Sequence, residues 1–180
     1  PDSEYGWEKL FSERLYLADA MALAYRARFA FINRPLINTK GQDTSAVYGF
    51  AISLLKLLED HRPEHIAVVF DALDGPPNFR DQLYEDYKAH RPPMPEGLKD
   101  GIPYIKELVR AFDIPVLEVP GVEADDVIGT LSKQAATEGV DVIIVSPDKD
   151  FRQLLQDDHS DNGGHGAISM LRPAYKGEEF

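Results

Sequence analysis

Hydrophobic residues along the chain follow two patterns, short continuous runs and longer segments with apolar side chains on one face. The continuous runs cover residues 15–18, 65–70, 114–119, 140–145 and 167–171. They predict buried strands, although a run as short as the first is also compatible with the start of a helix. The periodic segments cover residues 44–61, 96–112 and 123–138, and a further helix is expected to begin at Phe151. Thr44 or Ser45 is expected to cap the first of these helices.

Strands and helices alternate along the chain, which is typical of α/β domains. Consecutive strands in such domains pair in parallel through right-handed crossovers. The predicted fold class is therefore α/β, with a mostly parallel central sheet and helices on both faces. Residues 74–95 are polar and bordered by Gly and Pro, which predicts a mobile, partly helical segment. Residues 157–166 are expected to form a loop.

Length and composition exclude several classes of protein. The 180 residues suffice for about one domain, and the polar residues 1–14 are expected to form a leader or flexible N-terminus. The absence of cysteine excludes a disulfide scaffold, a thiol nucleophile and a cysteine-ligated metal. No charge-free apolar stretch is long enough to predict a membrane span. The net charge of −12 argues at first against a nucleic-acid partner, because phosphate-binding proteins usually carry net positive charge.

Acidic residues follow four of the predicted strands, close to the point where each strand ends. They are Asp19, Asp71, Glu123, Asp125, Asp126, Asp148 and Asp150. The carboxyl ends of parallel strands meet at one edge of a sheet, so these side chains are expected to converge there. Two unit charges roughly 4 Å apart repel by about 4 kcal/mol at an effective dielectric constant near 20, more than nearby helix N-termini offset. The cluster therefore predicts bound cations.

The chemistry of this acidic cluster favours hard divalent cations. Oxygen ligands without His or Cys select Mg²⁺ or Mn²⁺ over zinc. Two such ions suit hydrolysis of a phosphodiester, since one activates water and both stabilise the attacking and leaving oxygens. Taken singly, an Asp after a strand is more often a turn former or a helix cap. The coincidence at four strand ends is what favours a metal centre.

Basic and aromatic residues share one face of the segment after the second predicted strand. They are Arg80, Tyr84, Tyr87, Lys88 and Arg91. Lys and Arg could hold phosphates there, and Tyr could stack on an unpaired base. A solvated amphipathic helix interleaved with acidic residues is the ordinary alternative. Arg26, after the first strand, is either a comparable phosphate contact or a surface arginine.

Several strings of this chain, in this order, resemble one known family. They are Phe70–Ala72 (FDA), Tyr84–Pro95 (YEDYKAHRPPMP), Ile114–Glu118 (IPVLE), Glu123–Leu131 (EADDVIGTL) and Asp148–Asp150 (DKD). Together they resemble the 5′-nuclease domain of bacterial DNA polymerase I, which belongs to the flap-endonuclease group with a PIN-like fold. The resemblance runs from about Leu15 to Phe180 and implies a catalytic domain over residues 15–180.

This resemblance implies a nuclease that cuts 5′ flaps and removes RNA primers. Its implied cofactor is Mg²⁺ or Mn²⁺, bound as two ions. Implied partners are DNA with 5′ flaps or nicks, RNA–DNA primers and a polymerase domain in the same full-length chain, with no membrane, in the bacterial cytoplasm. The acidic residues above match the family's metal-site carboxylates. Arg80, Lys88 and Tyr87 match residues of the family's arch, expected around residues 74–95. Lys88 and Arg80 are the implied catalytic cations, and Arg26 matches a contact to a substrate phosphate.

The chain departs from the family pattern in two places. Ala20 follows Asp19 where the family usually has Gly. A further family ligand lies in a Gly-Asp-x-Ser-Asp-Asn string of a downstream helix-hairpin-helix region, expected beyond Phe180; Ser160–Asn162 echoes that string within the predicted loop. Two other functions stay open. They are a catalytically impaired module that positions nucleic acid, and a PIN-type ribonuclease, which would not need the segment Tyr84–Pro95.

Overall fold

The computed structural model describes residues 14–72, 76, 78, 80, 83, 92–157 and 165–173. Its elements are β1 (Arg14–Asp19), α1 (Ala20–Ala30), α2 (Ser45–His61), β2 (His65–Phe70), α4 (Glu96–Ala111), β3 (Val116–Glu118), α5 (Ala124–Thr137), β4 (Asp141–Val145), the 3₁₀ helix η2 (Lys149–Leu154) and β5 (Ile168–Leu171). All five predicted strands are present. Most of the predicted segment 74–95, most of the loop 157–166 and the leader up to residue 13 lie outside the described residues. Within them, no helix is long and apolar enough to cross a membrane.

The five strands form one parallel sheet in the order β3-β2-β1-β4-β5, which confirms the predicted fold class. β1 lies at its centre, where Tyr16 pairs with Ile66 of β2 on one side and with Ile143 of β4 on the other. From β1, the next two strands, β2 and β3, are added on one side. The chain then crosses to the other side of β1, where it adds β4 and β5. The strand order thus reverses between β1 and β4. In open parallel sheets, ligands bind at such a point, outside the carboxyl ends of the strands.

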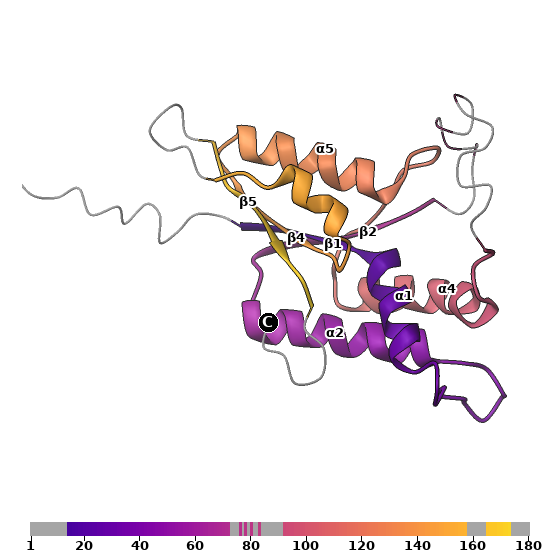
Figure 1. Cartoon of the computed structure of the whole chain (residues 1–180). Coiled ribbons are helices and arrows are strands. Elements are labelled where there is room, and N and C mark those ends of the chain that lie inside the picture. The colour runs from indigo at the N-terminus through magenta and orange to yellow at the C-terminus, as the bar shows by residue number, and fades with distance from the viewer. Residues whose placement is uncertain are drawn as a thin grey trace, which may run out of the picture.

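Alternate side chains of the strands face two separate hydrophobic cores, one on each face of the sheet. Tyr16 and Ala18 of β1 pack with α1, α2 and α4, whereas Leu17 between them packs with α5 and η2. Figure 1 shows the same division, with α1, α2 and α4 below the sheet and α5 with η2 above it. Burial on both faces explains why the strands are continuous apolar runs rather than alternating ones.

Helix α1 is the element that the sequence pattern did not predict. Its buried residues are mostly alanines, so they give a weak apolar stripe. The helix begins where Asp19 Oδ1 accepts a hydrogen bond from the backbone N–H of Ala22 at 3.1 Å, a typical N-cap contact. β1 therefore passes directly into α1 at a residue predicted to bind metal.

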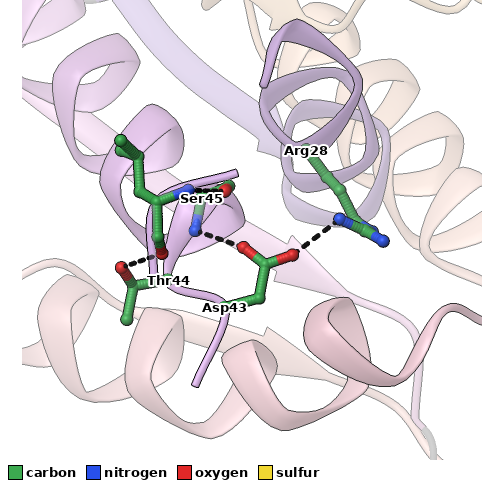
Figure 2. A network of polar contacts seen from close by, with 5 residues as sticks. Arg28, Asp43, Thr44 and Ser45 are labelled. Atoms are coloured by element: carbon green, nitrogen blue, oxygen red, sulfur yellow. Dashed lines mark hydrogen bonds and ion pairs between the residues drawn. The ribbon is translucent and has the colours of Figure 1, made fainter. Parts of the chain in front are cut away.

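The start of α2 is held by a polar network around Asp43, shown in Figure 2. Asp43 Oδ1 accepts from the backbone N–H of Ser45 at 3.0 Å, and its Oδ2 binds Arg28 of α1 at 2.8 Å. Thr44 occupies the N-cap position of α2, as predicted, but neither its side chain nor that of Ser45 makes a capping hydrogen bond. Their hydroxyls bond the backbone of Leu36 instead, at 2.9 and 2.8 Å, which fastens the loop before α2.

The network around Asp43 also contacts the start of α4. A Cβ at Gly97 would lie 3.0 Å from Asp43 Oδ2, so a larger residue there would require Asp43 to move by a few tenths of an ångström. Burial alone would raise the pKa of Asp43, but hydrogen bonding by Ser45 and the charge of Arg28 outweigh it and lower the pKa. The ionised carboxylate therefore ties α1 to the start of α2 and lies close to Gly97 of α4.

Candidate metal centre

Asp19 and Ser146 meet at the carboxyl edge of the sheet, where the strand order reverses. Asp19 is the last residue of β1 and Ser146 follows β4 directly, so parallel pairing brings them together. Ser146 Oγ donates to Asp19 Oδ2 at 2.9 Å and accepts from the backbone N–H of Asp148 at 3.0 Å. Both Asp19 and Ser146 are buried. The Ser146 hydroxyl therefore positions two predicted metal ligands, Asp19 through its side chain and Asp148 through its backbone.

Asp71 and Asp148 fix the local backbone on either side of this pair. Asp71 follows β2, and its Oδ1 accepts from the backbone N–H of Ala124, the first residue of α5, at 2.7 Å. Asp148 Oδ1 accepts from the backbone N–H of Asp150 at 2.9 Å and caps η2. Helix N-termini favour negative charge, so both contacts partly compensate the crowding of carboxylates. Glu123 occupies the N-cap position of α5 without a capping bond from its side chain.

Burial of Asp19 is costly for its charged form. Desolvation raises the pKa of Asp19 from 3.8 to about 6, and the charges of Asp71 and Asp148 add to the rise. Hydrogen bonds from Ala22 and Ser146 act in the opposite direction without cancelling it. Asp19 is therefore held in a field that disfavours its ionised form when no cation is nearby.

Asp125, near the start of α5, is subject to the same field. Its pKa also rises to about 6, first through desolvation and then through four neighbouring charges. These charges belong to Asp19, Asp71, Asp148 and Glu123. The side chain of Asp125 is exposed, so solvent screens part of this effect. The direction of the shift still shows that acids from all four strand ends act on one another, as the sequence predicts.

A depression of about 450 Å³ opens beside these carboxylates, between α5 and η2. Its acidic lining residues are Glu123, Asp125, Asp126, Asp148 and Asp150. Arg80 lines the same depression and binds both oxygens of Asp126 through two hydrogen bonds of 2.5 and 2.6 Å. Such a bidentate pair holds the guanidinium firmly. Asp126 therefore holds the positively charged guanidinium of Arg80 at the rim of the acidic depression.

The chemistry of these donors fits a hard divalent cation. The acids of the cluster offer carboxylate oxygens, and among the residues that the structure describes no His lines the depression. A bound cation would offset the desolvation and the neighbouring negative charges that raise the pKa of Asp19 and of Asp125. In the described part of the chain, no three His, Asp or Glu side chains are gathered tightly enough to hold one ion as they stand. The carboxylates share one electrostatic field without forming one coordination shell.

Some predicted site residues lie elsewhere. Arg26 is half-buried on α1 and does not line the depression. Tyr84, Tyr87, Lys88 and Arg91 lie outside the described residues, so their roles stay predictions, and the same holds for residues 160–162.

The structure also reveals residues that sequence reasoning missed. Ser146 is the clearest, because its hydroxyl links Asp19 to the backbone of Asp148. A polar residue directly after the most apolar strand was the available signal. Lys133 and Gln153 line the depression as well. Lys133 lies seven residues after Asp126 on α5, a spacing that repeats the helix face, so helical periodicity could have indicated it.

Comparison with known proteins gives consistent matches over most of the chain. Residues 14–176 match the family model described as 5′-3′ exonuclease, N-terminal resolvase-like domain. The chain is 48% identical over 159 residues to DNA polymerase I of Chloroflexus aurantiacus, a match that covers 88% of this chain and 16% of that protein. It is 44% identical over 143 residues to a 5′-3′ exonuclease of Aquifex aeolicus, covering 79% of this chain and 48% of that protein. The chain thus spans less than half the length of either relative.

A solved structure shares the fold. The flap endonuclease of bacteriophage T5, in a pseudo-enzyme–product complex with DNA and metal ions, superposes with a TM-score of 0.57. The match covers 88% of this chain and 54% of that one at 18% sequence identity. At this identity the likeness concerns the arrangement of strands and helices.

Proposed function

Because the chain belongs to the family of 5′-3′ exonuclease N-terminal, resolvase-like domains, we propose that it carries the active site of a divalent-metal-dependent 5′ nuclease. The reaction is hydrolysis of phosphodiesters at the 5′ ends and 5′ flaps of DNA and of RNA primers paired to DNA. One observation carries this proposal. Acids from four strand ends converge where the strand order reverses, and the charges of four of them add to desolvation in raising the pKa of Asp125.

The cofactor in this proposal is Mg²⁺ or Mn²⁺, as two ions, held by carboxylates of the cluster. These carboxylates are Asp19, Asp71, Glu123, Asp125, Asp126, Asp148 and Asp150. When bound, such ions lower the pKa of water and stabilise charge on the attacking and leaving oxygens. Ser146 keeps Asp19 oriented, and Asp71 keeps the start of α5 against the sheet edge.

Cations of the chain complete the proposed site. Arg80 is held at the rim by Asp126, within reach of a phosphate that enters the depression. The family resemblance adds Lys88 as a second cation that stabilises phosphoryl charge. It also adds Arg26, Tyr84, Tyr87 and Arg91 as contacts to the nucleic acid.

The whole protein is proposed to contain more than this domain. The chain covers 16% of the Chloroflexus aurantiacus polymerase I, so a polymerase domain in the same full-length chain is the expected partner. We further propose a downstream helix-hairpin-helix region that grips duplex DNA and supplies another ligand, and a location in the bacterial cytoplasm. DNA with 5′ flaps or nicks is the expected substrate.

Cleavage of a 5′-flap oligonucleotide by this chain, with Mg²⁺ or Mn²⁺ and with EDTA, tests the proposal. Asp125→Asn should abolish metal-dependent cutting without unfolding the chain, because it removes the carboxylate on which the others act. Asp60→Asn, on the exposed face of α2, is the matched control and should cut normally. If cutting requires a chain extended through the downstream region, Asp125→Asn should abolish that activity as well. Cutting in EDTA, or full activity of Asp125→Asn, would contradict the metal assignment.

A further inference from the structure

A second hollow lies along α4, on the opposite face of the sheet from the acidic depression. It has a volume of about 680 Å³ and is called the α4 groove below. Its cations are Lys99, Lys106 and Arg110, its acid is Glu107, and its apolar residues include Met94 and Ile102. α4 packs below the sheet and α5 above it, so the two hollows are separated by the sheet (Figure 1).

The α4 groove is locally basic in an acidic chain. It gathers three cations and one acid, whereas the whole chain has a net charge of −12. Lys106 is paired with Glu118 at 2.7 Å. Lys99 and Arg110 are exposed and form no ion pair within the part of the chain that the structure describes. Their two charges are therefore available to an anionic ligand, and a concave basic surface attracts polyanions.

One cation of the groove lies close to the strand that leads to the candidate metal centre. Lys106 Nζ lies 5.3 Å from the centre of the Phe70 ring, and Phe70 directly precedes Asp71. From Lys99 to Arg110 the helix rises about 16 Å at 1.5 Å per residue. A nucleic-acid strand that leaves the candidate metal centre beside β2 would thus lie close to the cations along α4.

We propose that the α4 groove binds the single-stranded part of the substrate, the 5′ flap beyond the cut. This inference rests on the proposed nuclease function. Single-strand sites combine cations that follow the backbone with apolar or aromatic surfaces for the bases. The groove offers both, since the exposed Pro93 and Pro103 lie in its lining beside the cations. Bases of a duplex are stacked inside it and would not reach these apolar side chains.

The test compares the double variant Lys99→Gln/Arg110→Gln with Lys56→Gln/Arg62→Gln, which removes the same charge from α2 and its end. The probe is a labelled oligothymidylate of about 20 nucleotides, bound in EDTA at several salt concentrations. Each phosphate contact to a single strand contributes about 0.7 to the slope of log affinity against log salt. The slope measured for the groove variant should therefore be smaller by about 1.4. Its loss of affinity relative to the unaltered chain should then change about sevenfold between roughly 50 and 200 mM salt. The control should keep the slope.

Cleavage kinetics separate the groove from the chemistry. The groove variant should show a raised KM for a long flap and an unchanged kcat, and it should cut a nicked, flap-free duplex normally. Equal losses on both substrates would overturn the proposal. If the unaltered chain fails to cut the flap-free duplex with metal, even when extended downstream, the proposed function itself fails.

A gain-of-function variant guards against misfolding as an explanation. Glu107→Gln removes the acid of the groove and should strengthen oligothymidylate binding, with a slope steeper by up to about 0.7. Loss of folding cannot produce that result. Unchanged binding by Glu107→Gln together with an unchanged slope for Lys99→Gln/Arg110→Gln overturns the proposal. A change in sedimentation without a change in binding also overturns it, because the groove would then join two copies of the chain.

Discussion

Replacing Asp19 by Asn tests the electrostatics of the candidate metal centre most directly. The pKa of Asp19 rises from 3.8 to about 6, which corresponds to roughly 3 kcal/mol of free energy against the charged form. Asn has the same shape without the charge. Its Oδ1 can still accept from Ala22, and its amide can donate to Ser146 Oγ once that hydroxyl turns. We expect the metal-free variant to be more stable than the unaltered chain by about 1–3 kcal/mol near pH 8.

The sign of this effect follows from proton linkage. The folded chain binds more protons than the unfolded chain between about pH 4 and pH 6, since the folded pKa is the higher one. The stability of the unaltered chain therefore decreases as pH rises through this window. The advantage of Asp19→Asn should be complete above about pH 7 and should vanish near pH 4. Urea unfolding in EDTA, followed by circular dichroism at several pH values, measures it.

Bound metal should make the unaltered chain more stable than Asp19→Asn. Mg²⁺ or Mn²⁺ at about 100 times the dissociation constant stabilises a folded protein by about 2.7 kcal/mol, and the variant should lose most of this gain. Asp60→Asn, an exposed change on α2, should follow the unaltered chain in every condition. A variant at position 19 that is less stable near pH 8 in EDTA, or whose advantage is independent of pH, would refute the assigned cause.

Two further predictions concern hydrogen bonds that the structure adds to the predicted site and fold. Ser146→Ala removes the donor to Asp19 and the acceptor for the backbone N–H of Asp148. The free energy of unfolding should therefore fall by about 1–3 kcal/mol, and the metal concentration for half-maximal cleavage should rise. Ser146→Thr keeps the hydroxyl and should restore both quantities. Asp43→Asn should destabilise the chain by about 1–2 kcal/mol at neutral pH. Because the pKa of Asp43 is lowered, its contribution is present above the unfolded pKa and disappears as pH falls through the folded one, so urea unfolding should show no difference in strong acid.

The fold could be predicted largely because its central strands, β1, β2 and β4, are buried on both faces. Two-sided burial produces continuous apolar runs, which a sequence shows directly, and the five runs became the five strands. Helix α1 escaped prediction because alanine fills its buried side without forming a distinct stripe. The third strand is shorter than its run, at three residues, because only Val116–Glu118 pair with β2 at the edge of the sheet.

The convergence of the acids could be predicted, but their partners could not. Position at a strand end follows from local pattern and parallel topology, so the sequence predicts that Asp19, Asp71 and Asp148 lie at one edge of the sheet. The hydrogen bond from Ser146 to Asp19 joins residues 127 positions apart, and the pair of Arg80 with Asp126 spans 46. No local pattern encodes such distances. Only the assembled edge shows which carboxylates are held by the protein's own donors.

The net charge of −12 argues against a nucleic-acid partner, yet the structure places the acidic and the basic residues on different surfaces. The acids gather between α5 and η2, where divalent cations would invert their sign for a phosphate. The cations Lys99, Lys106 and Arg110 gather on the other face, along α4. The two surfaces should therefore respond to different ions. Chelation should abolish cleavage without changing the salt slope of single-strand binding, and monovalent salt should weaken the capture of long flaps more than the cutting of flap-free ends.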